Sequence, residues 1–435
     1  MRSKIYTSLF VACLIFMTSC GEITDPTYFS EFIKHNTTEK QSSLSETVSL
    51  YVDYSTCVAE AKNSRFFAAT HPSIVDCSPV FYSIKGSVIK KETDNRQTVY
   101  SLLNNIHEVN FADIKSAVGQ IVNANNQAVI ITDGEYYMKD GAKDHCNNPY
   151  LAEEFRTWIN KGYDIYFYCE PYLESKKFNK YRYYILFTDD DIYDNINDRF
   201  SRSCSAEDYG VTVFHLSDGQ LRVNMDENYP VINATVSPSE NTKIENGIDV
   251  QEYYTKWSDM AKYMTEGDID QTYILRGLYV NNEESSSYKI TKIKPVVYQL
   301  YPEYEAFCNS KYLGEELPKA GKFKQVKNVF EIDEDIFEET GEIVLKLKEG
   351  FDGAGDLSYD HPNLLKVDFV VTDAENNFTR NEDVNLAFRW ESISKDCLEN
   401  TSLYESISQV LQSPKLNPKK REVVLYTVYI STYGL

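Results

Sequence analysis

The sequence lacks the short motifs on which many enzymes depend. It contains no G-x-S-x-G, H-E-x-x-H or Walker segment, and no histidine stands beside an obvious nucleophile. No C-x-x-C spacing suggests a zinc or redox centre. These absences argue against the reaction classes that such motifs mark, and we predict that the protein is not an enzyme.

Positive charge is also scarce. The 435 residues include 44 Lys and Arg but 66 Asp and Glu, so the formal net charge is −22. Because the phosphates of nucleic acid would be repelled, we predict no nucleic-acid partner. The excess of carboxylates is compatible with divalent cations and with a location outside the cytoplasm. Hydrophobic residues make up 42%, as in ordinary globular proteins, and the length allows two or three domains.

The apolar run near the N-terminus is too short to span a membrane. Residues 1–20 begin with Arg2 and Lys4, continue with apolar side chains and end in MTSC, which is the layout of a secretory signal peptide. MTSC resembles the lipobox of bacterial lipoproteins, including those of Bacteroidota, in which the cysteine is acylated. The resemblance implies a palmitate-type anchor on Cys20 and an outer-membrane lipoprotein on the periplasmic or cell-surface face. An ordinary cleaved signal is the alternative.

The rest of the chain divides into segments of different pattern. Residues 21–45 are rich in Ser, Thr, Lys and Glu, which predicts a flexible tether. In residues 46–219 apolar strands alternate with helical patterns, so we predict an α/β domain with a doubly wound, mainly parallel sheet. Residues 220–268 are predicted to connect the domains and to hold a helix at 250–264. Residues 269–435 show short strands with turn signals, typical of an immunoglobulin-like β-sandwich.

Two strands of the predicted α/β domain end in an aspartate. VSLYVD ends at Asp53, and AVIITD ends at Asp133. Ligands of such sheets bind beyond the carboxyl ends of the strands, so both aspartates are candidate site residues. The predicted strands are 48–53, 80–86, 128–133, 163–169 and 182–188, and the predicted helices are 111–125, 150–162 and 191–203.

These aspartates stand in motifs that resemble a known family. DYSTC (53–57) resembles the D-x-S-x-S loop of von Willebrand factor A domains, and VIITDGE (129–135) resembles their second strand with its T-D-G turn. NFADIKSAV (110–118) and FRTWINKGYDIYFYC (155–169) resemble the elements that the family has at these places in the chain order. The four elements together fall within residues 46–219 and leave the second half without a counterpart.

The resemblance implies an adhesion module with a metal-ion-dependent site. Asp53, Ser55 and Asp133 match ligands of Mg²⁺ or Mn²⁺, and the partner would be a protein or extracellular-matrix ligand that completes the coordination. Cys57 stands where the second serine belongs, and Ala112 stands where the threonine belongs. A thiol suits Mg²⁺ poorly and a methyl group is no ligand, so the site is predicted to be degenerate and weak.

Three alternatives stay open. Asp113 is either a substitute ligand or the N-cap of the next helix. A second alternative is a metal-dependent hydrolase, in which Asp53 and Asp133 would hold the metal. A third reading is a surface lipoprotein that captures glycans or other nutrients. Among the seven cysteines after Cys20, the five from Cys57 to Cys204 are the candidates for disulfides, with no pairing assigned.

Overall fold

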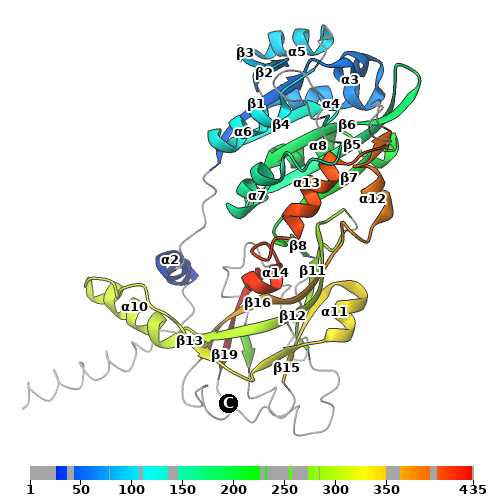
Figure 1. Ribbon diagram of the computed structural model, residues 1–435. Helices are drawn as coiled ribbons and strands as arrows, with labels where there is room; N and C mark the ends of the chain where they lie inside the picture. The colour runs from blue at the N-terminus through cyan, green and yellow to red at the C-terminus, as the bar shows by residue number, and fades with distance from the viewer. Residues whose placement is uncertain are drawn as a thin grey trace, which may run out of the picture.

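The computed structural model describes eleven stretches of the chain (Figure 1). Cys20 and most of the helix predicted at 250–264 lie outside the described residues. No helix within these stretches has the length and apolar character needed to cross a membrane. The described residues are 26–36, 44–77, 79–106, 111–135, 146–225, 231–232, 254–256, 273–283, 285–348, 363–391 and 399–433.

The first half of the chain forms a seven-stranded mixed sheet, in the order β3-β2-β1-β4-β6-β5-β7. β1 is parallel to both β2 and β4, and every other neighbouring pair in the sheet is antiparallel. β1, β2, β4 and β5 therefore point the same way. The bounds are β1 Ser45–Asp53, β2 Val80–Lys85, β3 Val88–Thr93, β4 Asn126–Thr132, β5 Asp164–Glu174, β6 Phe178–Thr188 and β7 Thr212–Leu216.

β6 departs from the parallel arrangement for a simple reason of chain length. The sequence pattern ended one strand at residue 169 and began the next at 182, which leaves room for a crossover. The strands instead run on to Glu174 and from Phe178, so only residues 175–177 join them. A three-residue connection can form only an antiparallel hairpin. The hairpin places β6 between β4 and β5.

Helices cover both faces of the sheet, as the alternation of strands and helices predicted. Leu50 and Val52 of β1 pack with Phe66 of α4 and Phe200 of α8. Tyr51 points to the other face, toward the side chains of α6 and α7. The helix bounds are α3 Thr56–Ala59, α4 Arg65–Asp76, α5 Arg96–Asn104, α6 Ile114–Ala124, α7 Ala152–Asn160 and α8 Ile196–Ser203.

The second half is rich in antiparallel sheet but also contains helices. One sheet has the order β10-β19-β16-β12-β13, and another has the order β14-β15-β11-β8 with β9 beside β11. The strands are β8 Val223–Met225, β9 Val231–Ile232, β10 Tyr254–Lys256, β11 Tyr273–Val280, β12 Tyr288–Gln299, β13 Lys324–Val326, β14 Phe330–Ile332, β15 Glu342–Leu347, β16 Asn363–Asn376, β17 Trp390–Glu391, β18 Glu399–Asn400 and β19 Val424–Tyr433. The helices are α10 Tyr301–Leu313, α11 Glu334–Thr340, α12 Glu382–Leu386, α13 Ser402–Leu411 and α14 Pro418–Arg421.

Two predictions about local structure were wrong. Residues 254–256 fall in a segment predicted as helix, yet they form β10, which pairs in parallel with β19. The hydrogen bonds to β19, a strand distant in the sequence, outweigh the helical spacing of apolar residues in this segment. The predicted tether contains helix α2, Pro26–Asn36. Phe29 and Phe32 of α2 are fully buried against Tyr304 and Phe307 of α10, so this short apolar face does find a core.

The second half also completes the cover of the seven-stranded sheet. α13 packs beside α7, and the Leu151 N–H donates to the Ser406 hydroxyl at 3.3 Å (Figure 1). Tyr183 of β6 donates to the Ala387 carbonyl at 2.9 Å, and its ring stacks on Phe388. Residues 378–391 and 399–411 therefore supply part of a core that the sequence pattern assigned to residues 46–219 alone.

One of the five cysteines predicted as disulfide candidates forms a disulfide, and the other four do not. Cys57, Cys77, Cys169 and Cys204 are free thiols, and Cys146 is disulfide-bonded. The sheet separates Cys57 from Cys169, because Cys57 lies in the core on one face and Cys169 in the core on the other.

Candidate metal centre

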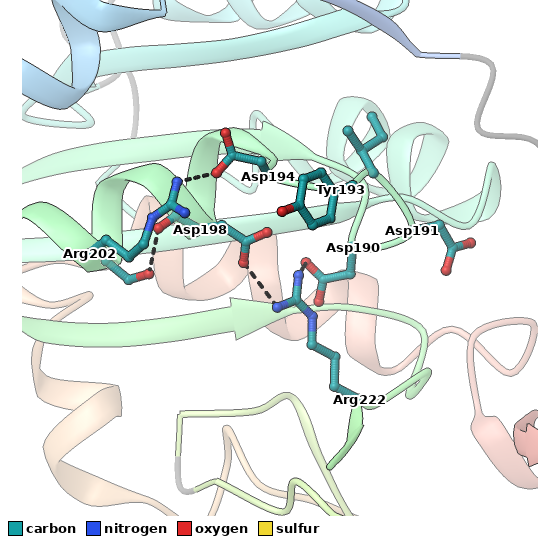
Figure 2. A pocket seen from close by; sticks show the side chains of 9 residues that line it. Asp190, Asp191, Tyr193, Asp194, Asp198, Arg202 and Arg222 are labelled. Carbon is teal, nitrogen blue, oxygen red and sulfur yellow. Dashed lines mark hydrogen bonds and ion pairs between the residues drawn. The ribbon is translucent and has the colours of Figure 1, made fainter. Parts of the chain in front are cut away.

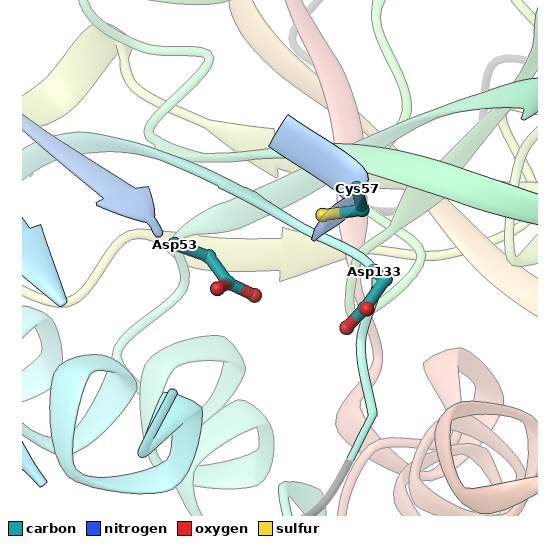
Figure 3. Close-up of side chains that lie close together, drawn as sticks. All are labelled: Asp53, Cys57 and Asp133. Carbon is teal, nitrogen blue, oxygen red and sulfur yellow. The ribbon is translucent and has the colours of Figure 1, made fainter. Parts of the chain in front are cut away.

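Asp53 and Asp133 meet at the carboxyl edge of the seven-stranded sheet, as their positions in the sequence predicted. Asp53 is the last residue of β1, and Asp133 directly follows β4, its parallel neighbour. Cys57, in the first turn of α3, points its sulfur toward the space between them (Figure 3). One oxygen of each carboxylate and the Cys57 sulfur lie within 4.8 Å of one another.

Asp53 is held by two hydrogen bonds that leave it little freedom. The Thr132 hydroxyl, from the end of β4, donates to Asp53 Oδ2 at 2.8 Å. The Ser55 N–H donates to Asp53 Oδ1 at 2.8 Å. The Ser55 hydroxyl lies 3.3 Å from Cys57 Sγ, within hydrogen-bond distance. The third predicted ligand, Ser55, therefore stands beside the centre.

The turn after Asp133 needs a glycine. Gly134 has a φ of +71°, a left-handed conformation that side chains other than glycine rarely adopt. A Cβ on Gly134 would also meet Tyr183 at 3.2 Å and would collide with Leu403 of α13. The turn lets the Glu135 N–H donate to Asp133 Oδ1 at 3.0 Å. A helix from the second half of the chain thus presses directly on the loop that carries Asp133.

Two buried cations flank the centre, and sequence analysis missed both. Lys180 of β6 lies 2.6 Å from Glu135 and 2.8 Å from Glu174. Arg182, two residues further along β6, lies 2.7 Å from Glu170 and donates two hydrogen bonds to the Cys57 carbonyl.

The alternation of side chains between the two faces of a strand is the signal that could have revealed these cations. Lys180 and Arg182 are two residues apart and so share one face of β6, and Glu170 and Glu174 share one face of β5. The register pairs Glu170 with Arg182 across the hairpin. The predicted strands 163–169 and 182–188 included Arg182 but left out Glu170, Glu174 and Lys180.

Negative charge exceeds positive charge in this buried region. The carboxyl groups of Asp53, Asp133, Glu135, Glu170 and Glu174 are all buried, and the buried cations that pair with members of this group among the described residues are Lys180 and Arg182. Burial raises the pKa of Asp53 to about 6. Burial, followed by repulsion from Glu135 and Asp53, raises the pKa of Asp133 well above its ordinary value. A divalent cation would offset this excess of negative charge.

The centre is enclosed rather than open. Asp53 is 1% exposed, Cys57 0% and Asp133 5%. The family resemblance implied an open coordination position for a carboxylate of the partner protein. With such burial, a cation at this position would contact the protein's own side chains.

The negative charge of Asp53 and Asp133 suits a divalent cation, but the ligand atoms at this centre are not all of the type that Mg²⁺ prefers. Mg²⁺ prefers oxygen ligands in octahedral geometry, and here a thiol takes one of the ligand positions. Asp113 supplies no replacement, because its carboxylate caps α6 by accepting from the Ser116 N–H at 3.0 Å and from the Ser116 hydroxyl at 2.7 Å. Ala112 is buried in the core and offers no donor. Of the two roles considered for Asp113, the N-cap is confirmed.

A second cluster of Asp and His lies at the opposite edge of the sheet. His215 Nε2 is 2.8 Å from Asp164 Oδ1, and the Asp190 N–H donates to Asp164 Oδ2 at 2.9 Å. Asp190 in turn accepts from the Tyr166 hydroxyl at 2.7 Å and pairs with Arg222 at 3.2 Å. Burial raises the pKa of Asp164 to about 7. Since each carboxylate oxygen in this cluster already has a partner, the network fastens β5 to β7.

A hollow of about 520 Å³ lies beside this second cluster (Figure 2). Four aspartates line it, but Arg222 pairs with Asp190 and with Asp198, and Arg202 pairs with Asp194. The ring of Tyr193 is 97% exposed at its rim. The charged groups of this hollow mainly satisfy one another.

No family model matches the chain, and neither a curated protein nor a solved structure matches it. The resemblance to factor A domains thus rests on the four sequence elements described above.

Proposed function

We propose that this protein is a cell-envelope lipoprotein that binds another protein, or an extracellular-matrix ligand, through the carboxyl edge of its seven-stranded sheet. In this proposal the sheet is a factor-A-like domain, the second half is a sandwich-like support, and Cys20 carries the lipid. A divalent cation between Asp53 and Asp133 holds the edge in its binding form.

The convergence of Asp53, Cys57 and Asp133 is the observation that carries the proposal. These side chains come from the ends of two adjacent parallel strands and from the helix between β1 and β2, with donor atoms within 4.8 Å of one another. Two like-charged carboxylates at this distance, with little solvent, repel one another unless protonated or bridged by a cation. Such an edge is also where sheets of this class present ligand-binding loops.

The role assigned to the cation follows from its enclosure. Because Asp53 and Asp133 are almost completely buried, the cation acts on the partner indirectly, by fixing the loops that follow β1 and β4. The same enclosure argues against the alternative of a hydrolase, since a substrate must reach a metal that activates water.

The test compares wild type with Asp133→Ala. The lipid-anchored protein is immobilised, and envelope proteins or matrix components that bind it are quantified with a divalent cation and with a chelator. We expect the chelator to reduce binding, and we expect Asp133→Ala to bind equally weakly under both conditions. Asp113→Asn is the matched control, because Asp113 caps α6, does not belong to the donor group of Asp53, Cys57 and Asp133, and asparagine also caps helices.

Two outcomes would contradict the proposal. Binding that ignores both the chelator and Asp133→Ala would separate partner recognition from the cation. A specific signal on a glycan array, with no protein partner, would favour the nutrient-capture alternative instead.

A further inference from the structure

Cys57 is the feature of the metal centre that the family resemblance leaves unexplained. Its side chain is fully buried, and its sulfur faces the carboxylates of Asp53 and Asp133 (Figure 3). The Ser55 hydroxyl lies 3.3 Å from the same sulfur. Cys57 belongs to the core on this face of the sheet, but its sulfur also has three oxygen-bearing groups beside it, which packing alone does not require.

A mixed oxygen and sulfur donor set selects among cations. Mg²⁺ prefers hard oxygen ligands, whereas Zn²⁺ accepts thiolate, imidazole and carboxylate ligands, and a thiolate in the set favours Zn²⁺ over Mg²⁺. Building on the cation site proposed above, we infer that the centre selects a thiophilic divalent cation of the Zn²⁺ class, with the Cys57 thiolate as a ligand beside Asp53 and Asp133.

The distances suit such an ion after small side-chain adjustments. Zn²⁺ binds sulfur at about 2.3 Å and carboxylate oxygen at about 2.0–2.2 Å, so tetrahedral donors stand roughly 3.5 Å apart. The three donor atoms here lie within 4.8 Å of one another, and the two aspartates are on adjacent strands. Ser55 or a water molecule takes the fourth position.

Hydrogen bonds already orient both carboxylates. Thr132 and the Ser55 N–H hold Asp53, and the Glu135 N–H holds Asp133. Outer contacts of this kind fix the direction of metal ligands and raise affinity.

Charge favours a cation at this position. Two carboxylates and a thiolate carry three negative charges, and a bound Zn²⁺ would offset two of them, while Arg182 and Lys180 are paired with Glu170 and Glu135. The thiol proton leaves to solvent when the sulfur binds the metal. Within the described part of the chain, Cys57 is the only cysteine that belongs to such a group of donors.

Cobalt is the probe for the thiolate ligand. The purified full chain is stripped with a chelator and titrated with Co²⁺, whose bond to a thiolate gives a near-ultraviolet charge-transfer band. We expect wild type to show this band and Zn²⁺ to abolish it by displacement. Cys57→Ser should show no band, and its Zn²⁺ affinity should fall by at least about 10–100-fold, the loss typical of a damaged metal site.

Two further variants complete the design. Cys308→Ser changes a half-buried cysteine on α10, so it should keep both the band and the affinity of wild type. Asp133→Asn keeps Cys57 but removes a charged ligand, so it should weaken Zn²⁺ binding even if Cys57→Ser fails to fold. Circular dichroism establishes which variants are folded.

Thermal unfolding with each cation separates this inference from the function on which it rests. If Mg²⁺ raises the melting temperature as much as Zn²⁺, or if bound Co²⁺ lacks the band, the thiophilic selection is overturned while a cation site remains. If no cation shifts the melting temperature of wild type, the cation site itself is lost and the inference fails with it.

Discussion

At the residue scale, Asp53 is the best-placed reporter of the buried carboxylates. Its pKa of about 6 in the folded protein compares with about 4 in an unfolded chain, so the folded state binds more protons between these values. The contribution of Asp53 to the free energy of unfolding of the metal-free protein should therefore fall as pH rises from 4 to 6 and then level off. Asp53→Asn should flatten this profile and stabilise the protein at pH 7 by roughly 2 kcal/mol, measured by urea unfolding in chelator.

Asp333 is the control for this prediction, because its pKa shifts in the opposite direction. Its hydrogen bond and ion pair with Lys346 lower the pKa of its carboxyl, so its contribution is present above the unfolded value and is lost as pH falls. Asp333→Asn should therefore destabilise the protein at pH 7. If Asp53→Asn also destabilised the protein at pH 7, the burial and mutual repulsion of the carboxylates would not be costly to the folded state.

Lys180 tests the burial of the ion pairs around the centre. Lys180→Met leaves Glu135 and Glu174 without their cation in a region that excludes water, so we expect a loss of about 3–5 kcal/mol. Lys292 lies 2.9 Å from Glu334, a similar distance, but both side chains are exposed. Lys292→Met should change the free energy of unfolding by less than about 1 kcal/mol. Equal losses in urea unfolding would show that burial is not the cause.

Sequence analysis could find the aspartates of the centre but not the residues that surround them. Asp53 and Asp133 were visible because each ends an apolar strand, and parallel strands bring such ends together. The ion pairs of Lys180 and Arg182 depend on the hairpin, which places β6 beside β4 and brings both side chains to their partners on β5. Asp113 was ambiguous in sequence, since a carboxylate before a helix serves equally well as a cap or as a ligand.

At the element scale, the contact of residues 378–391 and 399–411 with the seven-stranded sheet invites a direct test. Phe388 packs against Phe167, Tyr183 and Phe214, which come from three neighbouring strands. Phe388→Ala should lower the free energy of unfolding by about 3–5 kcal/mol, the usual range for deleting a buried ring. Hydrogen exchange should rise in β5, β6 and β7, although the change lies in the second half of the chain. Loss of protection confined to residues 378–391 and 399–411 would contradict this coupling.

The same elements show where pattern reading succeeds. β1, β4, α6 and α7 were predicted close to their observed bounds, because each has a clear period of apolar residues and a clear end. α4 was missed, since Pro72 interrupts its pattern. α2 was missed because three apolar residues within a polar stretch form a face only when α10 is there to receive them. Such partners lie hundreds of residues away, beyond the reach of any local pattern.

At the scale of the whole molecule, the proposed lipid anchor on Cys20 would determine where this acidic protein resides. Cys20→Ala removes the only atom that the lipobox resemblance assigns to acylation. We expect the variant to be released from membranes or to persist as an unprocessed precursor, as judged by detergent-phase partitioning and by mass. A processed Cys20→Ala protein that still enters the detergent phase would refute the lipoprotein assignment.

The docking of α2 has a geometrical consequence for such an anchored protein. Only residues 21–25 separate Cys20 from Pro26, the first residue of α2. A stretch of this length reaches about 20 Å at full extension. α2 is fixed against α10 in the second half of the molecule, and the seven-stranded sheet lies toward the other end (Figure 1). A lipid on Cys20 would therefore keep the second half of the molecule close to the bilayer. The seven-stranded sheet, with its candidate metal centre, would lie on the side that faces away from the membrane.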